Sequence, residues 1–333
     1  MISAHHLLMD GVSWRILIED LHQLMDQSLL GKDLHLPNKT ESFQSWSIKL
    51  QEYSQSIQIN NTKSWLIPTK YLAITQPQFI SFVHSSSEFE PKVGNITRII
   101  DKKLSLQICG TANRAVHTEP QDLMTTALVM ALSDITGLTN IVLEMENHGR
   151  IASFSADVGR TLGWFTTMIP AIFEVAQGDD LFLLISGVKE ELRRVSRDAM
   201  IYGLLKYRHK QELTEEQLEA KYPRFNYLGD LSLLSSKTLV LDPKGTRLDI
   251  SKHDRLPSMF DLNVFLLDGN LHYSLMYNVE ELSHEVANQL LERVTISLDE
   301  ISKYCNSQRI GRFTPSDFDT TSLSQEELDS LFY

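Results

Sequence analysis

The 333-residue chain has few cysteines, no surplus of basic residues and no long apolar run. Its two cysteines, Cys109 and Cys305, lie far apart and outside any CxxC or Cys/His cluster, which argues against disulfides or zinc and favours a reducing, cytoplasmic compartment. The formal net charge of −12 disfavours nucleic acid and anionic lipid as partners. No apolar window approaches the length of a membrane span, and the first residues do not form a signal peptide, so no membrane association is expected.

The chain also lacks the short signatures of several enzyme classes. It contains no GxSxG elbow, no GxxxxGK[ST] loop and no GxGxxG after a strand pattern. These absences argue against a serine hydrolase, a P-loop protein and a dinucleotide-binding enzyme. No metal site is expected either, because His5 and His6 lack the HExxH spacing that places two histidines on one helical face.

Helical and strand patterns alternate along the chain, which predicts an α/β fold. Apolar residues at three- and four-residue spacing from Trp14 to Met25 predict a helix with Ser13 as its N-cap and Gly31 as its end. The other predicted elements are helices over 42–57, 61–67, 120–137, 181–198 and 283–304, strands over 95–104 and 140–150, and a hairpin over 258–278 around Asp268-Gly269-Asn270. A stretch with several prolines, 68–95, is predicted to be a linker. The tail after 312 is predicted to be an extended connector that ends in a short helix.

The stretch AHHLLMDGVSW, residues 4–14, contains a pair of histidines close to the first residue. Histidine is the natural acid or base near neutral pH, because its unperturbed pKa is about 6.5. Adjacent side chains on an extended backbone point to opposite sides, so only one of His5 and His6 would face a given cavity. A purely structural pair is the alternative interpretation.

The stretch LEMENHGR, residues 143–150, ends a predicted buried strand with acidic residues. Alternation places Glu144, Glu146 and His148 on one side of it, opposite Leu143 and Met145. Burial at a strand end would raise a carboxyl pKa toward a value useful for proton transfer. The alternative is a solvated strand end at which Glu146 pairs with a nearby arginine.

Taken in order, these motifs resemble the epimerization domains of nonribosomal peptide synthetases, which belong to the condensation-domain superfamily. HHLLMDGVSW is similar to the HHxxxDG motif that condensation and epimerization domains share. ENHGR (146–150), GRTLGWFTTMIP (159–170) and FNYLGD (225–230) resemble motifs of epimerization domains in particular, and YGLLKYR (202–208) and the tail also resemble family segments.

The resemblance implies a two-lobed fold like that of chloramphenicol acetyltransferase, with a tunnel between the lobes. It also implies inversion of the α-carbon of an aminoacyl or peptidyl thioester, from L to D, by acid/base proton exchange. By motif position, His6 and Glu146 become the two acid/base groups. Supporting or structural roles fall to His5, Asp10, Gly11, His148 and Arg150, and the candidates that line the tunnel are Asn226, Tyr227 and Trp164. We expect Asp10 to pair with Arg150 and brace the loop that holds His6, and we expect Trp14 and Trp164 to act mainly as core anchors.

The resemblance implies no directly bound cofactor, because the substrate arrives on the 4'-phosphopantetheine arm of a peptidyl carrier protein. Neighbouring synthetase domains are the other expected partners. Peptide-bond formation, as in a condensation domain, is one alternative function. A remnant that binds a carrier protein without turnover is another.

The sequence departs from the family pattern at two places. Asn147 replaces the usual glycine of EGHGR, and we expect asparagine to tolerate a left-handed turn there. The strands that precede HHxxxDG in the family are not seen, so residues 1–92 are predicted to be the remainder of an incomplete first lobe. Residues 93–312 would form the second lobe and residues 313–333 a connector. Either a longer chain or a second chain would supply the missing wall of the tunnel.

Overall fold

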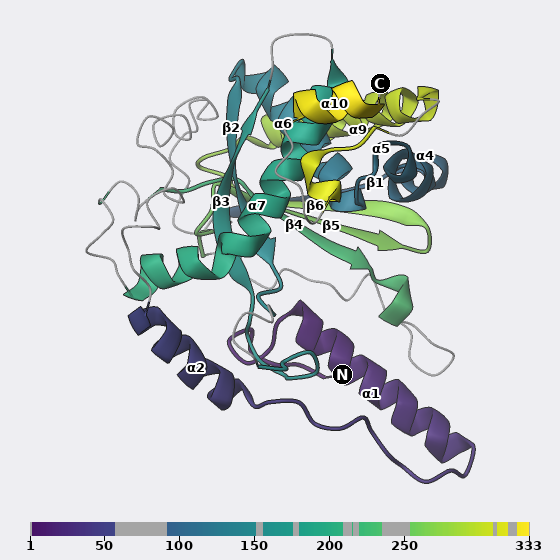
Figure 1. The fold of residues 1–333 in the computed structure, drawn as a ribbon, viewed down its shortest axis with the longest axis vertical. Coiled ribbons are helices and arrows are strands. Elements are labelled where there is room, and N and C mark those ends of the chain that lie inside the picture. Colours follow the sequence, from purple (N-terminus) through teal and green to yellow (C-terminus); the bar gives the residue numbers. More distant parts are fainter. Residues whose placement is uncertain are drawn as a thin grey trace.

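The computed structural model describes residues 2–56, 92–150, 156–175, 180–208, 215, 220–234, 254–308, 312–318 and 325–332 (Figure 1). Its strands are β1 Val93–Ile99, β2 Asn140–Asn147, β3 Thr167–Glu174, β4 Arg224–Asp230, β5 Phe260–Leu267 and β6 Asn270–Asn278. Its α-helices are α1 Gly11–Leu29, α2 Phe43–Ser56, α4 Lys102–Leu106, α5 Ala112–Val116, α6 Pro120–Thr136, α7 Leu181–Arg208, α9 His284–Ser307 and α10 Gln325–Phe332. Shorter helical segments are η4 Gln107–Thr111, η7 Ser232–Leu234 and η8 Pro315–Asp317.

The described strands form one mixed sheet in the order β1-β6-β5-β4-β2-β3. The central pairs β2–β4 and β4–β5 are parallel, and the pairs toward both edges are antiparallel. The parallel pairs place Arg224 of β4 beside Glu144 of β2 and Asp261 of β5. Residues far apart in sequence therefore meet at the centre of the sheet.

The two faces of the sheet differ in chemistry because side chains alternate along each strand. One face packs against α6, α7 and α9 in the main core, and its members include the almost fully buried residues Leu143, Met145, Phe225, Leu262 and Leu275. The other face carries the residues that alternate with these on the central strands, namely Glu144, Glu146, Arg224, Asn226 and Asp261. The predicted alternation along 140–147 is confirmed, and it leaves a row of charged side chains on one face.

Several predicted elements are confirmed, together with the local signals that predict them. Pro120 begins α6 within a capping box, and Gly137 ends this helix in the left-handed conformation. The predicted hairpin is β5–β6, and its turn residues Asp268 and Gly269 both have positive φ, which suits the twist of a tight hairpin. The side chain of Ser283 caps α9.

Other predicted boundaries are wrong for identifiable reasons. Asp10 rather than Ser13 caps α1, because the Ser13 hydroxyl donates instead to the carbonyl of Gly163. The strand over 95–104 ends at Ile99, because the side chain of Asp101 caps α4. The helix over 181–198 continues to Arg208. The predicted helix over 61–67 and most of the predicted linker lie outside the described residues.

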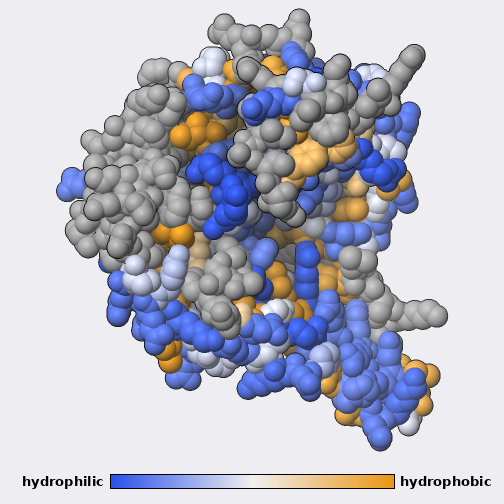
Figure 2. All heavy atoms as spheres, viewed as in Figure 1, coloured by the Kyte–Doolittle hydropathy of each residue, from blue (hydrophilic) through white to orange (hydrophobic). Residues whose placement is uncertain are grey.

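The N-terminal helices α1 and α2 lie at one end of the molecule in Figure 1, apart from the helices that cover the sheet. A second, smaller hydrophobic cluster joins α2 to α7 and to the segment before β3, and it consists of Trp46, Ala156, Val158, Phe165 and Met200. The far end of α1, at the lower right of Figure 2, exposes a group of hydrophobic side chains that includes Leu29, Leu30 and Leu34. No described helix combines the length and the hydropathy needed to cross a membrane.

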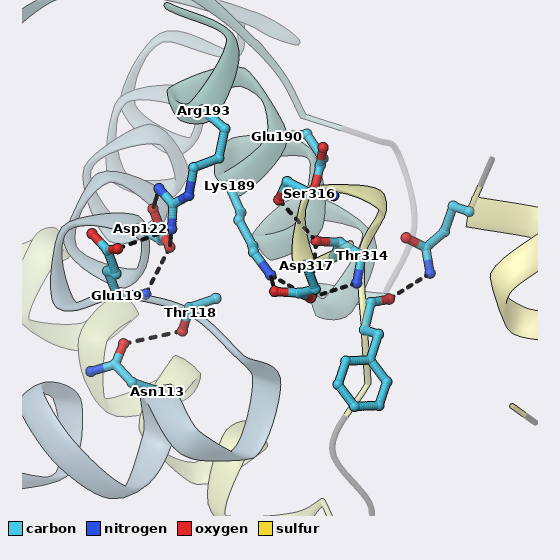
Figure 3. Close-up of polar contacts among 12 residues, drawn as sticks. Asn113, Thr118, Glu119, Asp122, Lys189, Glu190, Arg193, Thr314, Ser316 and Asp317 are labelled. Carbon is cyan, nitrogen blue, oxygen red and sulfur yellow. Dashed lines mark hydrogen bonds and ion pairs between the residues drawn. The ribbon is translucent and has the colours of Figure 1, made fainter. Parts of the chain in front are cut away.

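The described part of the tail packs against α7 through charged groups (Figure 3). The buried ammonium of Lys189 donates to both carboxylate oxygens of Asp317 at 2.7 Å. The backbone N–H of Ser316 donates to Glu190, and that of Thr314 donates back to Asp317 in a capping box. These contacts attach the segment around η8 to the middle of α7.

Candidate active site

A buried ion pair joins the N-terminal segment to the loop after β2. The expected contact between Asp10 and Arg150 is present at 3.0 Å, and their side chains are 1% and 6% exposed. One oxygen of Asp10 caps α1 through the N–H of Ser13, and the other accepts from the N–H of Phe165 at 3.1 Å. Arg150 also donates to the Ser13 hydroxyl at 3.0 Å. Asp10 therefore connects the start of α1 to the loop after β2 and to the segment before β3.

The loop between β2 and Arg150 needs a glycine at Gly149 rather than at Asn147. Gly149 has φ +64°, and a Cβ there would lie 1.7 Å from the carbonyl oxygen of Phe165. Asn147 is the last residue of β2 and has no positive φ, so the expected left-handed turn at this position is wrong. The ring of His148 accepts the backbone N–H of Arg150 at 3.0 Å, a contact that orders the loop.

The two histidines lie in a turn and not on extended backbone, so the expected alternation does not apply to them. The N–H of Leu8 donates to the carbonyl of His5, and the ring of His5 accepts from the N–H of Leu7 at 3.1 Å. The ring of His6 is exposed and lies against Trp164, with 5.5 Å between ring centroids. Gly11 begins α1, with open space where a Cβ would lie.

Glu146 lies near the end of β2, on the charged face of the sheet, and its side chain is 20% exposed. Burial raises its pKa to about 7, and the positive charge of Arg224 offsets part of this effect. The carboxylates of Asp261 and Glu144 raise the pKa further, and His6 lowers it. Glu146 can therefore both take up and release a proton near neutral pH. His6 is therefore one of the charged groups that act on the pKa of Glu146.

A cluster of charged residues surrounds Glu146 on the neighbouring strands. Arg224 donates from Nε and Nη2 to Glu144 at 2.9 and 2.7 Å, and it lies 3.9 Å from Glu146. Asp261 lies 3.6 Å from the same guanidinium. Burial raises the pKa of the Asp261 carboxyl, and Arg224 lowers it. The alternative interpretation of Glu146 holds in part, because Arg224 lies within ion-pair distance of it, but the side chain is mostly buried and does not lie at a solvated strand end.

The side chains of Asn226 and Tyr227, adjacent residues of the FNYLG motif, point to opposite faces of β4. The amide of Asn226 donates to Oε2 of Glu146 at 2.7 Å, on the charged face. Tyr227 packs against the main core, and its hydroxyl contacts the thiol of Cys109. The structure therefore brings Asn226, but not Tyr227, to Glu146. Trp164 is half-buried beside His6.

Sequence reasoning missed Arg224 and Asp261 as neighbours of Glu146. Both are polar residues in strands that are otherwise largely apolar, RFNYLGD and FDLNVFLL. A charged residue in such a strand is the local signal that could have indicated them, because an unpaired buried charge is costly. Arg224 and Asp261 come close to Glu146 only through pairing of strands that are distant in sequence, and no local sequence pattern predicts that pairing.

Three comparisons with known proteins agree on one family. The model of the family described as Condensation domain matches residues 1–324. Bacitracin synthase 1 of Bacillus licheniformis is 31% identical over 333 residues, which are 99% of this chain and 6% of that protein. Gramicidin S synthase 1 of Brevibacillus brevis is 30% identical over 354 residues, or 99% of this chain and 31% of that protein. The chain thus spans less than a third of these relatives.

Solved structures of other domains are also similar to this chain, and two of them serve as examples. The epimerization domain from the third module of tyrocidine synthetase B, TycB3(E), superimposes with a TM-score of 0.75 at 26% identity, covering 90% of this chain and 68% of that one. The condensation domain from Monacolin K polyketide synthase MokA superimposes with a TM-score of 0.66 at 15% identity, covering 92% and 69%.

Proposed function

Because the chain belongs to the condensation-domain family, we propose that it inverts the α-carbon of an aminoacyl or peptidyl thioester carried on phosphopantetheine. The chain has the α/β fold of these domains, which is like that of chloramphenicol acetyltransferase. Its relatives include synthases of bacitracin and gramicidin S, so a peptidyl carrier protein and neighbouring synthetase domains are the proposed partners. The solved structure TycB3(E) is itself an epimerization domain, which supports the proposal.

The observation that carries the proposal is the environment of Glu146. A carboxyl group whose pKa is raised to about 7 can act as acid and as base at neutral pH, whereas an ordinary glutamate is a weak acid catalyst there. Inversion requires a proton to leave one face of the α-carbon and another to arrive at the opposite face. His6 and Glu146 supply two such groups from different segments of the chain.

The proposed reaction removes one proton from the α-carbon and returns one proton to it. One of the two groups takes the α-proton, and the electron pair of the broken C–H bond moves into the thioester carbonyl to give an enolate. The other group delivers a proton to the opposite face, and the carbonyl re-forms. The roles of Glu146 and His6 reverse when the D-residue is the substrate, because the reverse reaction follows the same path.

The proposal is tested by α-hydrogen exchange on a carrier-bound substrate in deuterated water. We expect deuterium at the α-carbon and a mixture of D and L residues. His6→Ala and Glu146→Gln should each reduce the rate of inversion by about 10²–10⁴-fold, the usual contribution of a general acid or base. The matched controls are His284→Ala and Glu285→Gln, two exposed positions at the start of α9. Inversion that persists in either test variant would refute the assigned roles.

Peptide-bond formation is the second candidate, because the family model is that of condensation domains. In that case His6 would act on an attacking amine, and Glu146 would not be needed. Donor and acceptor carrier proteins supplied together would then give a peptide without α-deuterium. Binding of a carrier protein with neither product would identify a non-catalytic remnant, which is the third outcome.

A further inference from the structure

Three carboxylates of the charged face converge on a single guanidinium. Arg224 lies 2.7 Å from Glu144, 3.6 Å from Asp261 and 3.9 Å from Glu146. The four side chains are between 10% and 20% exposed. If all three carboxyl groups were ionised, this partly buried cluster would carry two net negative charges, and burial of uncompensated charge is costly. Protonation of carboxyl groups in the cluster lowers this net charge.

The contacts divide the positive charge of Arg224 unequally. Two guanidinium nitrogens donate to the same carboxylate oxygen of Glu144, in charge-assisted hydrogen bonds. Asp261 has the guanidinium on one oxygen and the hydroxyl of Ser258 on the other. Glu146 lies furthest from the positive charge, and its hydrogen-bond donor is the neutral amide of Asn226. This amide satisfies either protonation state of Glu146 without adding charge.

We propose that Arg224 is a positioning residue for Glu146: by taking Glu144 as its close ion-pair partner, it leaves Glu146 as the carboxyl group through which the cluster exchanges a proton. This inference deepens the proposed function and rests on it. It concerns a residue outside the motifs that indicated the family, and its basis is the arrangement of side chains across β2, β4 and β5.

The described charged groups that face Glu146 come from four elements. They are Glu144 on the same strand, Arg224 on β4, Asp261 on β5 and His6 in the N-terminal segment. Arg224 lowers the pKa of Glu146, and Glu144 raises it. Removal of the arginine and removal of its partner glutamate should therefore move the titration of Glu146 in opposite directions. A residue that only supported the fold would not have this effect.

The test is a titration of Glu146 in the full chain labelled with ¹³C at the glutamate side-chain carboxyl carbon and followed by NMR. The Glu146→Gln spectrum assigns the signal by its absence. We expect a midpoint near 7 in the parent protein. Arg224→Gln should raise it and Glu144→Gln should lower it, each by about one unit or more. The matched control Arg293→Gln removes an arginine whose partners are Asp134 and Glu300, and it should leave the midpoint unchanged.

Equal midpoints in the parent and the Glu144→Gln variant would overturn the proposal, as would shifts of the same sign in both variants. Because Arg224→Gln removes the cation that the three carboxylates share and can unfold the protein, the isosteric Glu144→Gln variant is sufficient by itself. The same samples are assayed for α-hydrogen exchange. Opposite NMR shifts without exchange in the parent protein would refute the proposed function while leaving the charge arrangement in place, so the two failures are distinguishable.

Discussion

Replacement of Asp10 by asparagine should weaken the contacts that hold the start of α1 against Arg150 and Phe165. Asparagine can keep an oxygen at the position that caps α1, but its NH₂ group would then face the N–H of Phe165 and the guanidinium of Arg150, which are both donors. Breaking one side of a buried pair costs about 3–5 kcal/mol. Arg150 keeps two backbone carbonyls and a hydroxyl as acceptors, so we expect the lower end, about 3 kcal/mol.

Hydrogen–deuterium exchange measures this loss where it occurs. A cost of about 3 kcal/mol corresponds to roughly 10²-fold faster opening of the first turns of α1 and of the segment 156–166. Asp26→Asn, an exposed aspartate on the same helix, is the control and should exchange like the parent. Unchanged protection of α1 in Asp10→Asn, together with full α-exchange activity, would refute the reasoning that this ion pair braces the site.

The other predictions concern three further positions. Because the pKa of Glu146 is raised above its ordinary value, the protonated carboxyl group stabilises the folded state at low pH, and this contribution is lost as the pH rises through about 7. The free energy of unfolding of the parent should therefore fall relative to that of Glu146→Gln by up to about 3 kcal/mol between pH 5 and pH 8. Urea denaturation at the two pH values measures this difference. Gly149→Ala should lower the free energy of unfolding by about 2 kcal/mol or more, because of its positive φ and the close carbonyl. Lys189→Met should increase protease cleavage around Asp317 by about tenfold or more, because it removes two charge-assisted hydrogen bonds.

Each of these predictions has a matched control and a contradicting result. Glu146→Gln and the parent should differ equally at pH 5 and pH 8 if the carboxyl group titrates normally. Gly110→Ala adds a Cβ into open space, so similar losses at both glycines would contradict the steric argument. Lys303, whose side chain is 76% exposed, provides the control for Lys189. Equal cleavage in the two lysine variants would show that the buried ion pair does not hold the tail.

Local sequence patterns predicted those elements whose defining residues lie within a few positions of one another. The helix α6 with its terminal glycine, the tight turn of β5–β6 and the alternation of β2 are of this kind. The same alternation placed Glu144 and Glu146 on one side, and the structure confirms this placement. Motif resemblance brought Asn226 to the neighbourhood of Glu146, where the two side chains form a hydrogen bond.

The features that were missed depend on long-range pairing. Arg224 meets Glu144 only because β2 and β4 are parallel neighbours, and no residue between them encodes that pairing. The cap of α1 was assigned to the wrong residue because Ser13 has a partner 150 positions away, at Gly163. The sequence therefore indicated the proposed acid/base groups and not the charged residues that surround Glu146.

The strand order of the sheet also has a consequence for the time at which the protein folds. Among the described strands, β1 pairs with β6 alone, where Val93 lies opposite Asn278. At about 5–20 residues per second, a ribosome needs on the order of 10–40 s to synthesise the chain between these two strands. During that interval the backbone donors and acceptors of β1 lack their native partner, and an unpaired strand edge favours aggregation. We therefore expect the yield of soluble protein to depend more on the rate of translation and on chaperones than on the final stability of the sheet.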